Sequence, residues 1–484
     1  MDRNCCSRQE TIASRREFLQ KSGLGFGSLA LGYLLGREEE LKGAPATSLA
    51  GYDNPLGPKI SNFHGPAKNV IFLFMKGGPS QIDTFDPKPD LNRFDGQLLP
   101  PSFQSEDLNL QFITASQARL MGTRRTFQPR GQSGLEIADT FPQLAQHADD
   151  LAVIRSCHHD AFIHGPAMHA LNTGTIQLGH PSMGSWAVYG LGSESDNLPA
   201  FIIMSESDRV STKALYGSGF LPAAYQGTLF RTKGTPLRNL SSPVDRADQR
   251  QILDQIKAWN QQHLQQGRDD DSRLSARIGS YELAFRMQAA APELIDLSQE
   301  KKTIRQMYGL DQEVTQGFGN MCLLARRMVE RGVRFVQLYA SGWDTHSEND
   351  KGTLESARKI DQPIAGLLGD LKQRGLLEST LVVWTGEFGR TPIVQGNQGR
   401  DHNPYGFTTW MAGGGIRGGK AIGATDELGF RAVEDKVHVH DLHATMLSLL
   451  GLDHERLTYF FEGRDRSLTD VGGQNDLAKR LMRA

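Results

Sequence analysis

Short runs of consecutive apolar residues recur along the chain, each bounded by glycine, proline or polar residues. The clearest run covers residues 69–75, which follow Pro66 and end at Gly77-Gly78-Pro79. A run that is apolar at every position predicts a strand buried on both faces, as in a parallel sheet. The same pattern recurs at residues 151–154, 200–204, 335–339, 381–385 and 408–412.

Helical patterns lie between these runs, for example at residues 357–371 and 442–450. Strands that alternate with helices predict an α/β fold, with a mostly parallel central sheet and helices on both of its faces. Ligands of such sheets bind beyond the carboxyl ends of the strands. Functional side chains are therefore expected just after the apolar runs.

Two segments interrupt the alternation of strands and helices. Residues 87–134 are rich in proline, glutamine and arginine and predict loops over the sheet edge. Residues 245–311 are polar with helical spacing and predict a helical insertion or cap, whose plain interpretation is a solvated helical face. We expect residues 51–484 to form a single domain that includes both insertions.

The N-terminal residues 1–50 contain an arginine pair, Arg15-Arg16, followed by Phe18-Leu19 and a weakly apolar stretch at 22–35. This order is typical of the twin-arginine (Tat) signal, although Gln20 replaces the usual lysine. The signal predicts a partner, the Tat export machinery, and a periplasmic or extracytoplasmic location. A surface helix that carries two arginines is the alternative, and cleavage after Ser48-Leu49-Ala50 or retention as an anchor both stay open.

Charge and cysteine content narrow the function classes. The formal net charge is −2, and no basic run is interleaved with aromatic residues, so no nucleic-acid partner is expected. Cys5 and Cys6 lie in the N-terminal segment, which leaves Cys157 and Cys322 as a pair that can form one disulfide. Because no Cys-x-x-Cys motif is present, histidine and carboxylate groups must hold any metal.

Histidines and acidic residues gather where the predicted strands end. Residues 157–169 contain four of the 14 histidines, and Asp344 and His346 follow the run at 335–339. His402 comes just before the run at 408–412. A zinc-like divalent ion takes three or four nitrogen and oxygen ligands, so Asp344, His346 and His402 are predicted as a ligand set. The other histidines singled out as structural or surface residues are His169, His438, His440 and His443.

Two familiar motifs are excluded. Residues 414–420 nearly spell a phosphate-binding loop, but Ala421 stands where its serine or threonine belongs, so a glycine-rich turn is expected. No Gly-x-Ser-x-Gly elbow occurs, which argues against a serine-triad hydrolase.

Longer motifs resemble a known family. Residues 360–389 and 440–452 resemble helix and strand segments of sulfatases and other alkaline phosphatase superfamily members, and His402-Asn-Pro-Tyr resembles a metal-binding segment of cofactor-independent phosphoglycerate mutases. Residues 75–88, 342–346 and 386–392 are typical of an export-tagged, sulfatase-like family, domain of unknown function 1501. The resemblance runs from about residue 69 to 452. It implies an alkaline phosphatase-like fold.

The resemblance also implies a site that departs from the superfamily pattern. Its enzymes hold two metal ions, and the first ligand set matches Asp344, His346 and His402. In the second set, Lys76-Gly77 stands in place of an aspartate, and Glu387-Phe388 replaces an Asp-His pair. His164 falls at the position of the usual nucleophile.

Two hypotheses follow. In the first, His164 and Glu387 complete an altered centre for a divalent metal, zinc or alternatively Mn, Fe or Ca. The protein would hydrolyse phosphate or sulfate esters of small molecules or glycans without a covalent intermediate. The predicted catalytic residues are then His164, His159 or Asp160 as general base, and Arg390 to neutralise developing charge. In the second, the protein is a catalytically inactive, exported binding or scaffold protein.

One further residue has two interpretations. Asp83, in the loop after the first predicted strand, is a further metal ligand if the loop folds back. The equally plausible interpretation is that its carboxylate caps the turn before Pro87.

Overall fold

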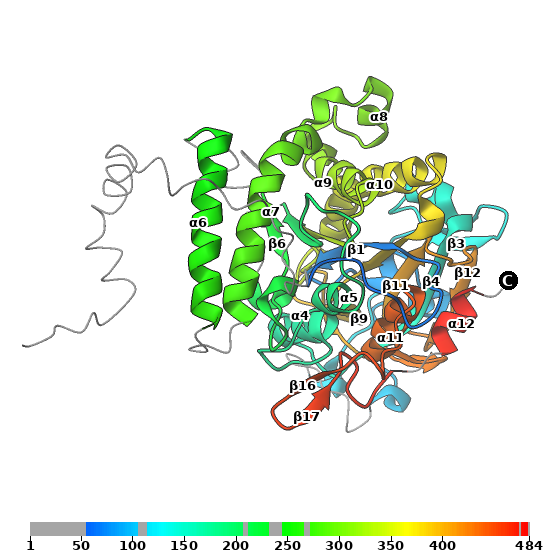
Figure 1. Ribbon diagram of the computed structural model, residues 1–484. Coiled ribbons are helices and arrows are strands. Elements are labelled where there is room, and N and C mark those ends of the chain that lie inside the picture. The colour runs from blue at the N-terminus through cyan, green and yellow to red at the C-terminus, as the bar shows by residue number, and fades with distance from the viewer. Residues whose placement is uncertain are drawn as a thin grey trace, which may run out of the picture. The chain divides into compact units, whose positions relative to one another are not determined.

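The computed structural model describes residues 55–104, 114–206, 212–231, 244–265, 272–473 and 476–482 (Figure 1). The chain divides into two compact units, residues 1–53 and 54–484, and every described residue belongs to the second. The candidate export motif, with Arg15 and Arg16, lies outside the described residues.

A nine-stranded sheet forms the centre of the second unit. Its strand order is β12-β4-β11-β8-β1-β7-β5-β6, and β15 also pairs with β4. All pairs are parallel except those of β11, which runs antiparallel to β4 and β8. The strands are β1 (Asn69–Lys76), β4 (Leu151–His158), β5 (Phe201–Ser205), β6 (Thr228–Phe230), β7 (Phe335–Ser341), β8 (Thr380–Thr385), β11 (Phe407–Ala412), β12 (Lys420–Ile422) and β15 (Val437–His438). The predicted mostly parallel α/β fold is confirmed.

Helices cover both faces of this sheet. Figure 1 shows α9 and α10 on one side and α4, α5 and α11 on the other. The helices are α3 (Pro89–Arg93), α4 (His164–Thr173), α5 (Met183–Leu191), α6 (Arg246–Gln265), α7 (Ser272–Ile295), α8 (Lys302–Met307), α9 (Glu313–Glu330), α10 (Asn349–Gln373), α11 (Val439–Leu449) and α12 (Asp476–Met482). None of the described helices is long and apolar enough to span a membrane.

Four hairpins accompany the central sheet. They are β2 (Phe127–Arg130) with β3 (Leu135–Ala138), β9 (Gly389–Gln395) with β10 (Gly399–Asn403), β13 (Ala424–Thr425) with β14 (Ala432–Glu434), and β16 (Tyr459–Phe461) with β17 (Arg464–Arg466). The β9–β10 hairpin connects β8 to β11.

The position of β1 in the sheet explains why residues 70–75 are all apolar. Ile71 and Leu73 pack into the cluster that contains α9 and α10, whereas Phe72 and Phe74 pack into the cluster that contains α4, α5 and α11. Successive side chains of a strand point to opposite faces, and both faces are covered here. Each fully buried side chain of this size contributes about 1.5–3 kcal/mol to stability.

The same two clusters decide whether the cysteines pair. Cys157 lies in the cluster with α4, and Cys322 lies in the cluster with α9, on the opposite face of the sheet. Both are buried free thiols. Burial raises the pKa of the Cys157 thiol to about 12. The two cysteines therefore form no disulfide with each other.

The two predicted insertions have different structures. Within residues 87–134, the described part contains α3 and β2, and Leu120 forms a β-bridge with Ile393 of β9. Residues 245–311 contain α6 and α7, which lie side by side in Figure 1 and are joined by an ion pair between Arg250 and Glu282 at 2.8 Å. They also contain α8.

The antiparallel strand β11 brings a distant segment to the functional edge of the sheet. Its first residue, Phe407, pairs with Cys157 near the carboxyl end of β4. The start of β11 therefore lies at the edge where the parallel strands end. Because β10 directly precedes β11, His402 reaches the same edge as the residues that follow β7.

A buried histidine beside this core makes stability sensitive to acid. His443 of α11 is 2% exposed, and its Nε2–H donates to the Leu171 carbonyl at 2.8 Å. Burial, the largest influence, lowers the pKa of His443 from its ordinary value of 6.5 to about 3. Between these values the unfolded chain binds a proton that the folded chain does not. The stability that neutral His443 supplies is thus complete above pH 6.5 and is lost as pH falls toward 3.

We therefore expect the free energy of unfolding to fall less steeply with acid in His443→Gln than in the wild type. One proton corresponds to a slope difference of about 1.4 kcal/mol per pH unit. Urea unfolding at pH 7, 6, 5 and 4 measures this slope, and His64→Gln, at an exposed position, is the control. Equal slopes in wild type and His443→Gln would contradict the prediction.

Candidate metal centre

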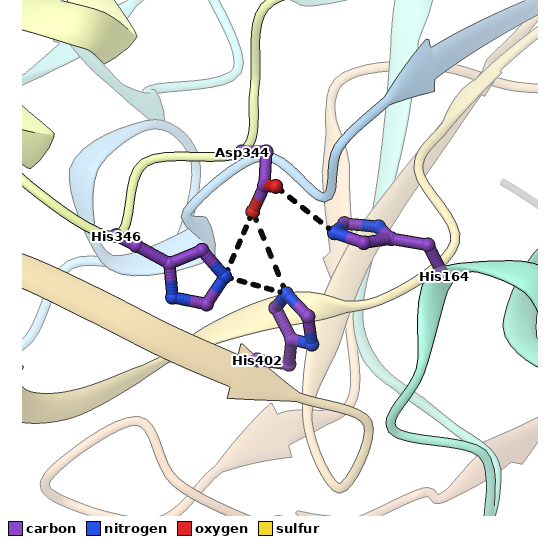
Figure 2. A group of neighbouring side chains, drawn as sticks. All are labelled: His164, Asp344, His346 and His402. Atoms are coloured by element: carbon purple, nitrogen blue, oxygen red, sulfur yellow. Dashed lines mark hydrogen bonds and ion pairs between the residues drawn. The ribbon is translucent and has the colours of Figure 1, made fainter. Parts of the chain in front are cut away.

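Four side chains from three parts of the chain converge at the carboxyl edge of the sheet (Figure 2). Asp344 and His346 follow β7, His402 lies on β10, and His164 is the first residue of α4. Each offers one ligand atom, and these atoms all lie within 4.8 Å of one another. The structure thus brings together Asp344, His346 and His402 with His164, which the first hypothesis also assigned to the centre.

A glycine allows the strand ends to approach closely. Gly77 follows β1 with a φ of 119°, in the region that side chains other than glycine rarely adopt. A Cβ atom at this position would lie 2.4 Å from the backbone nitrogen of Asp344. Only glycine therefore lets the end of β1 pass beside the segment that carries the ligands.

Asp344 is the hub of the group. Its Oδ1 lies 3.0 Å from His346 Nε2 and 3.5 Å from His402 Nε2, while its Oδ2 lies 3.2 Å from His164 Nε2. Burial alone would raise the pKa of this carboxyl, but hydrogen bonds from the three histidines and from Arg390 outweigh burial and hold the pKa well below its usual range. Asp344 is therefore a carboxylate at any ordinary pH.

The Nδ1 atom of each imidazole is held by a separate acceptor. The His402 Nδ1–H donates to the Phe162 carbonyl at 2.7 Å, and the His346 Nδ1–H donates to Gln395 Oε1 at 2.5 Å. The His164 Nδ1–H donates to Glu387 Oε1 at 2.7 Å. Each acceptor takes the Nδ1 proton of its ring, so a neutral ring would have Nε2 free of a proton and able to bind an ion.

This donor set fits a cation. His346 Nε2 and His402 Nε2 lie 2.9 Å apart, and both face the carboxylate Oδ1. These three atoms form a compact set of possible ligands, and a cation among them would be attracted to all three. Imidazole and carboxylate ligands, each oriented by a second hydrogen bond, are the usual environment of zinc and related divalent ions.

His164 differs from the other two histidines. It approaches Oδ2 of Asp344, whereas His346 and His402 approach Oδ1, as Figure 2 shows. Burial, the largest influence, lowers the pKa of His164, but hydrogen bonds to Asp344 and Glu387 together raise it to about 9. In the protein without metal, His164 thus carries a proton at neutral pH.

Glu387 lies behind His164 and outside the converging group. Its side chain is fully buried, and its carboxylate accepts hydrogen bonds from the Gly77 N–H at 2.9 Å and from His164. The structure therefore places Glu387, predicted as a direct metal ligand, as the residue that orients His164.

Arg390 is buried and therefore does not contact a substrate directly in this structure. Its side chain is fully buried, and it donates to Asp344 Oδ1 at 2.7 Å and to the carbonyls of Gly78 and Arg400 at 3.0 Å each. It also donates to the carbonyl of Gly77. Every nitrogen of Arg390 already has an acceptor, so the structure shows Arg390 holding Asp344 in place, and its role in neutralising developing charge stays a prediction.

The two candidate general bases, His159 and Asp160, are not among the four converging side chains. His159 is 3% exposed; its Nδ1 accepts from the Ala161 N–H at 3.0 Å, and its Nε2–H donates to the Glu387 carbonyl at 2.5 Å. Burial lowers the pKa of His159 to about 4. Asp160 is exposed and does not belong to the converging group. Both ring nitrogens of His159 thus have main-chain partners, and the role of Asp160 as a general base stays a prediction.

Asp83 takes neither of its two predicted roles, because its carboxylate binds side chains of other segments and does not cap the turn before Pro87. Its carboxylate is buried and forms an ion pair with Arg400 Nε at 3.0 Å, and it accepts hydrogen bonds from Ser80 and Asn349. Since these partners occupy both oxygens together with Thr123, Asp83 is a buried support for the loop and not a ligand.

Three supporting groups were not predicted from the sequence: Gln395, the Phe162 carbonyl and the ring of Phe388. The Phe388 ring stacks on His402 with 4.3 Å between ring centroids. A main-chain acceptor leaves no mark in the sequence, and Gln395 is identified only once β9 is seen to pair with β10.

Comparisons with known proteins place the chain in a family. Residues 67–479 match the family described as "Protein of unknown function (DUF1501)". A search of the curated proteins finds no match.

Several solved structures align with this chain at low similarity. A PsFucS1 sulfatase from Pseudoalteromonas sp. is 12% identical, covers 85% of this chain and 72% of its own, and has a TM-score of 0.36. The lipoteichoic acid synthase LtaP from Listeria monocytogenes is 8% identical over 82% of this chain and 77% of its own, with a TM-score of 0.33. The alkaline phosphatase from the Antarctic bacterium TAB5 is 10% identical over 80% and 99%, with a TM-score of 0.33. The family match spans most of the sequence, and the chain therefore belongs to the DUF1501 family.

Proposed function

We propose that this protein is an exported, metal-dependent hydrolase of phosphate or sulfate esters that uses a single divalent ion. The observation that carries the proposal is the convergence of three imidazole nitrogens on the Asp344 carboxylate, each ring held at Nδ1 by its own acceptor. Zinc suits this ligand set, and Mn or Fe are alternatives with the same ligand types.

Asp344, His346 and His402 would hold the ion, because their atoms gather around one carboxylate oxygen. When bound, a divalent ion of this kind lowers the pKa of water and polarises an ester oxygen. Asp344 is half-exposed and His346 about one-third exposed, so the ligand set faces solvent on one side. Water and a substrate can therefore approach the centre.

His164 would move the proton at Nε2. Glu387 fixes its Nδ1–H, as a buried carboxylate orients a catalytic histidine, and leaves Nε2 facing the centre. Water attacks phosphorus or sulfur, the bond to the ester oxygen breaks, and the departing alcohol takes up one proton. His164 is within reach of both sides of this exchange, either as a proton carrier or as the fourth ligand.

The proposal has two further parts, which are the export of the protein and the class of its substrate. The Arg15-Arg16 motif supports export by the Tat machinery and a periplasmic or extracytoplasmic location. The motif resemblance to sulfatases favours small-molecule or glycan esters as substrates.

A second candidate function is an exported binding or scaffold protein without catalysis. The observation in its favour is Phe388, whose ring stacks on His402 and lies 5.0 Å from the His164 ring. An apolar ring fills the position where the resemblance implies a second metal-binding imidazole. If the four remaining side chains all bind the ion, a tetrahedral site is closed to substrate.

Metal removal and replacement separate these functions. Protein treated with a chelator is expected to lose hydrolysis of 4-nitrophenyl phosphate or 4-nitrophenyl sulfate, and one of Zn, Mn, Fe(II) or Ca should restore it. Hydrolysis that survives complete metal removal would overturn the proposal. Stoichiometric metal binding with no turnover of either ester would favour the binding protein.

A further inference from the structure

A second cavity, of about 400 Å³, lies against the same segment that builds the metal centre. Its wall includes residues 159–163, where the Phe162 carbonyl holds His402 and Ile163 directly precedes His164. The remaining wall comes from α4, the turn after it, and the start of α11. The cavity therefore lies against the segment that also supports His402 and leads into His164.

One side of the cavity is an exposed apolar surface. Ile163 and Ile176 line it and are each 59% exposed, and Phe162 and Pro166 complete this side. A ligand that covers isoleucine side chains in a concave wall removes their apolar surface from water, which favours binding.

The other side of the cavity offers polar groups. Asp160 lines it and forms no hydrogen bond or ion pair with any described residue, so its carboxylate is available as an acceptor. His438 Nδ1 accepts from the His440 N–H at 3.2 Å, which places the proton of the neutral ring on Nε2. Burial, the largest influence, lowers the pKa of His438 to about 4, so this ring is a neutral donor at ordinary pH.

The charge of the cavity wall restricts the charge of the ligand that can bind there. Among the described residues that line the cavity there is no lysine or arginine, and Asp160 is an anion. A second sulfate or phosphate group would be repelled here. A ligand with one apolar face and several hydroxyl groups matches both sides of the wall.

We propose that this cavity binds an uncharged sugar residue of a glycan whose ester group lies at the metal centre. The inference rests on the proposed function for the position of the ester, but sugar binding itself requires neither metal nor catalysis. The apolar face of the ring covers Ile163 and Ile176, and its hydroxyl groups bond to Asp160 and His438.

Saturation-transfer NMR with lactose, maltose and cellobiose tests this on the purified full chain. At least one of these neutral disaccharides should bind the wild type. Ile176→Asp should weaken its binding about tenfold, equivalent to about 1.4 kcal/mol. The matched control is Leu178→Asp, because Leu178 is 73% exposed, close in sequence and outside the cavity wall.

A third variant separates this inference from the proposed function. His346→Ala removes a side chain of the centre that contacts no residue of the cavity wall, and it should leave disaccharide binding unchanged. The inference is overturned if no disaccharide binds the wild type, if Ile176→Asp binds as well as the wild type, or if His346→Ala abolishes binding. Sugar binding by a protein without hydrolysis would retain the cavity and reject the enzyme.

Discussion

His346→Ala is expected to lower kcat/KM for ester hydrolysis by more than about 100-fold. The change removes a nitrogen that lies 3.0 Å from Asp344 and 2.9 Å from His402, at the centre of the ligand set. Loss of a residue one step behind a metal ligand already costs about 10–100-fold in metal affinity or activity. Loss of the ligand itself should cost more.

The fold should survive this change, because His346 is about one-third exposed. Steady-state kinetics and the thermal midpoint measure the two effects separately. His147→Ala is the control, since its imidazole is also partly exposed and lies 3.4 Å from a carboxylate, that of Asp150, outside the centre. Activity of His346→Ala within a few-fold of the wild type would reject His346 as a ligand.

Arg390→Leu is expected to destabilise the protein by about 3–5 kcal/mol, because each buried carbonyl left without a donor costs about 1–3 kcal/mol. Arg390 is fully buried, and the carbonyls of Gly77, Gly78 and Arg400 accept its N–H groups. Leucine would leave these carbonyls without a donor. Arg390→Lys should recover only part of the loss, because an ammonium group does not reproduce the planar donor set.

Urea unfolding measures the effect of Arg390→Leu. Arg93→Leu is its control, because Arg93 also contacts an aspartate at 2.7 Å but is 73% exposed at the side chain. Exposed pairs of this kind contribute about 0–1 kcal/mol. Equal stability losses in the two variants would show that Arg390 does not hold the strand ends together.

The sheet was predictable from the sequence where its strands are buried on both faces. The run at 69–75 corresponds to β1, because six consecutive apolar positions can all be buried only between two layers of helices. The short strands β6, β12 and β15 were not predicted, since two or three residues carry no recognisable pattern. The antiparallel direction of β11 left no mark in its sequence either.

The ligands were predictable, but the roles of their neighbours were not. Asp344 and His346 follow from a strand end, because position along the sheet needs no knowledge of packing. His402 precedes its strand and reaches the same edge only because β11 runs antiparallel. Arg390 and His159 were assigned to catalysis from their residue types and from their positions just after predicted strands. Their burial and their main-chain partners depend on segments that are distant in the sequence. His159, for example, contacts the carbonyl of Glu387, 228 residues away.

The central claim, that His402 and its neighbours hold one metal ion, is tested most directly by elemental analysis of protein purified without a histidine tag. Wild type and His402→Ala are compared at equal protein concentration. The structure predicts close to one Zn, Mn or Fe per wild-type chain and little metal in His402→Ala, because the variant lacks a nitrogen 3.5 Å from Asp344. Equal metal content in the two proteins, or no metal in either, would contradict the account.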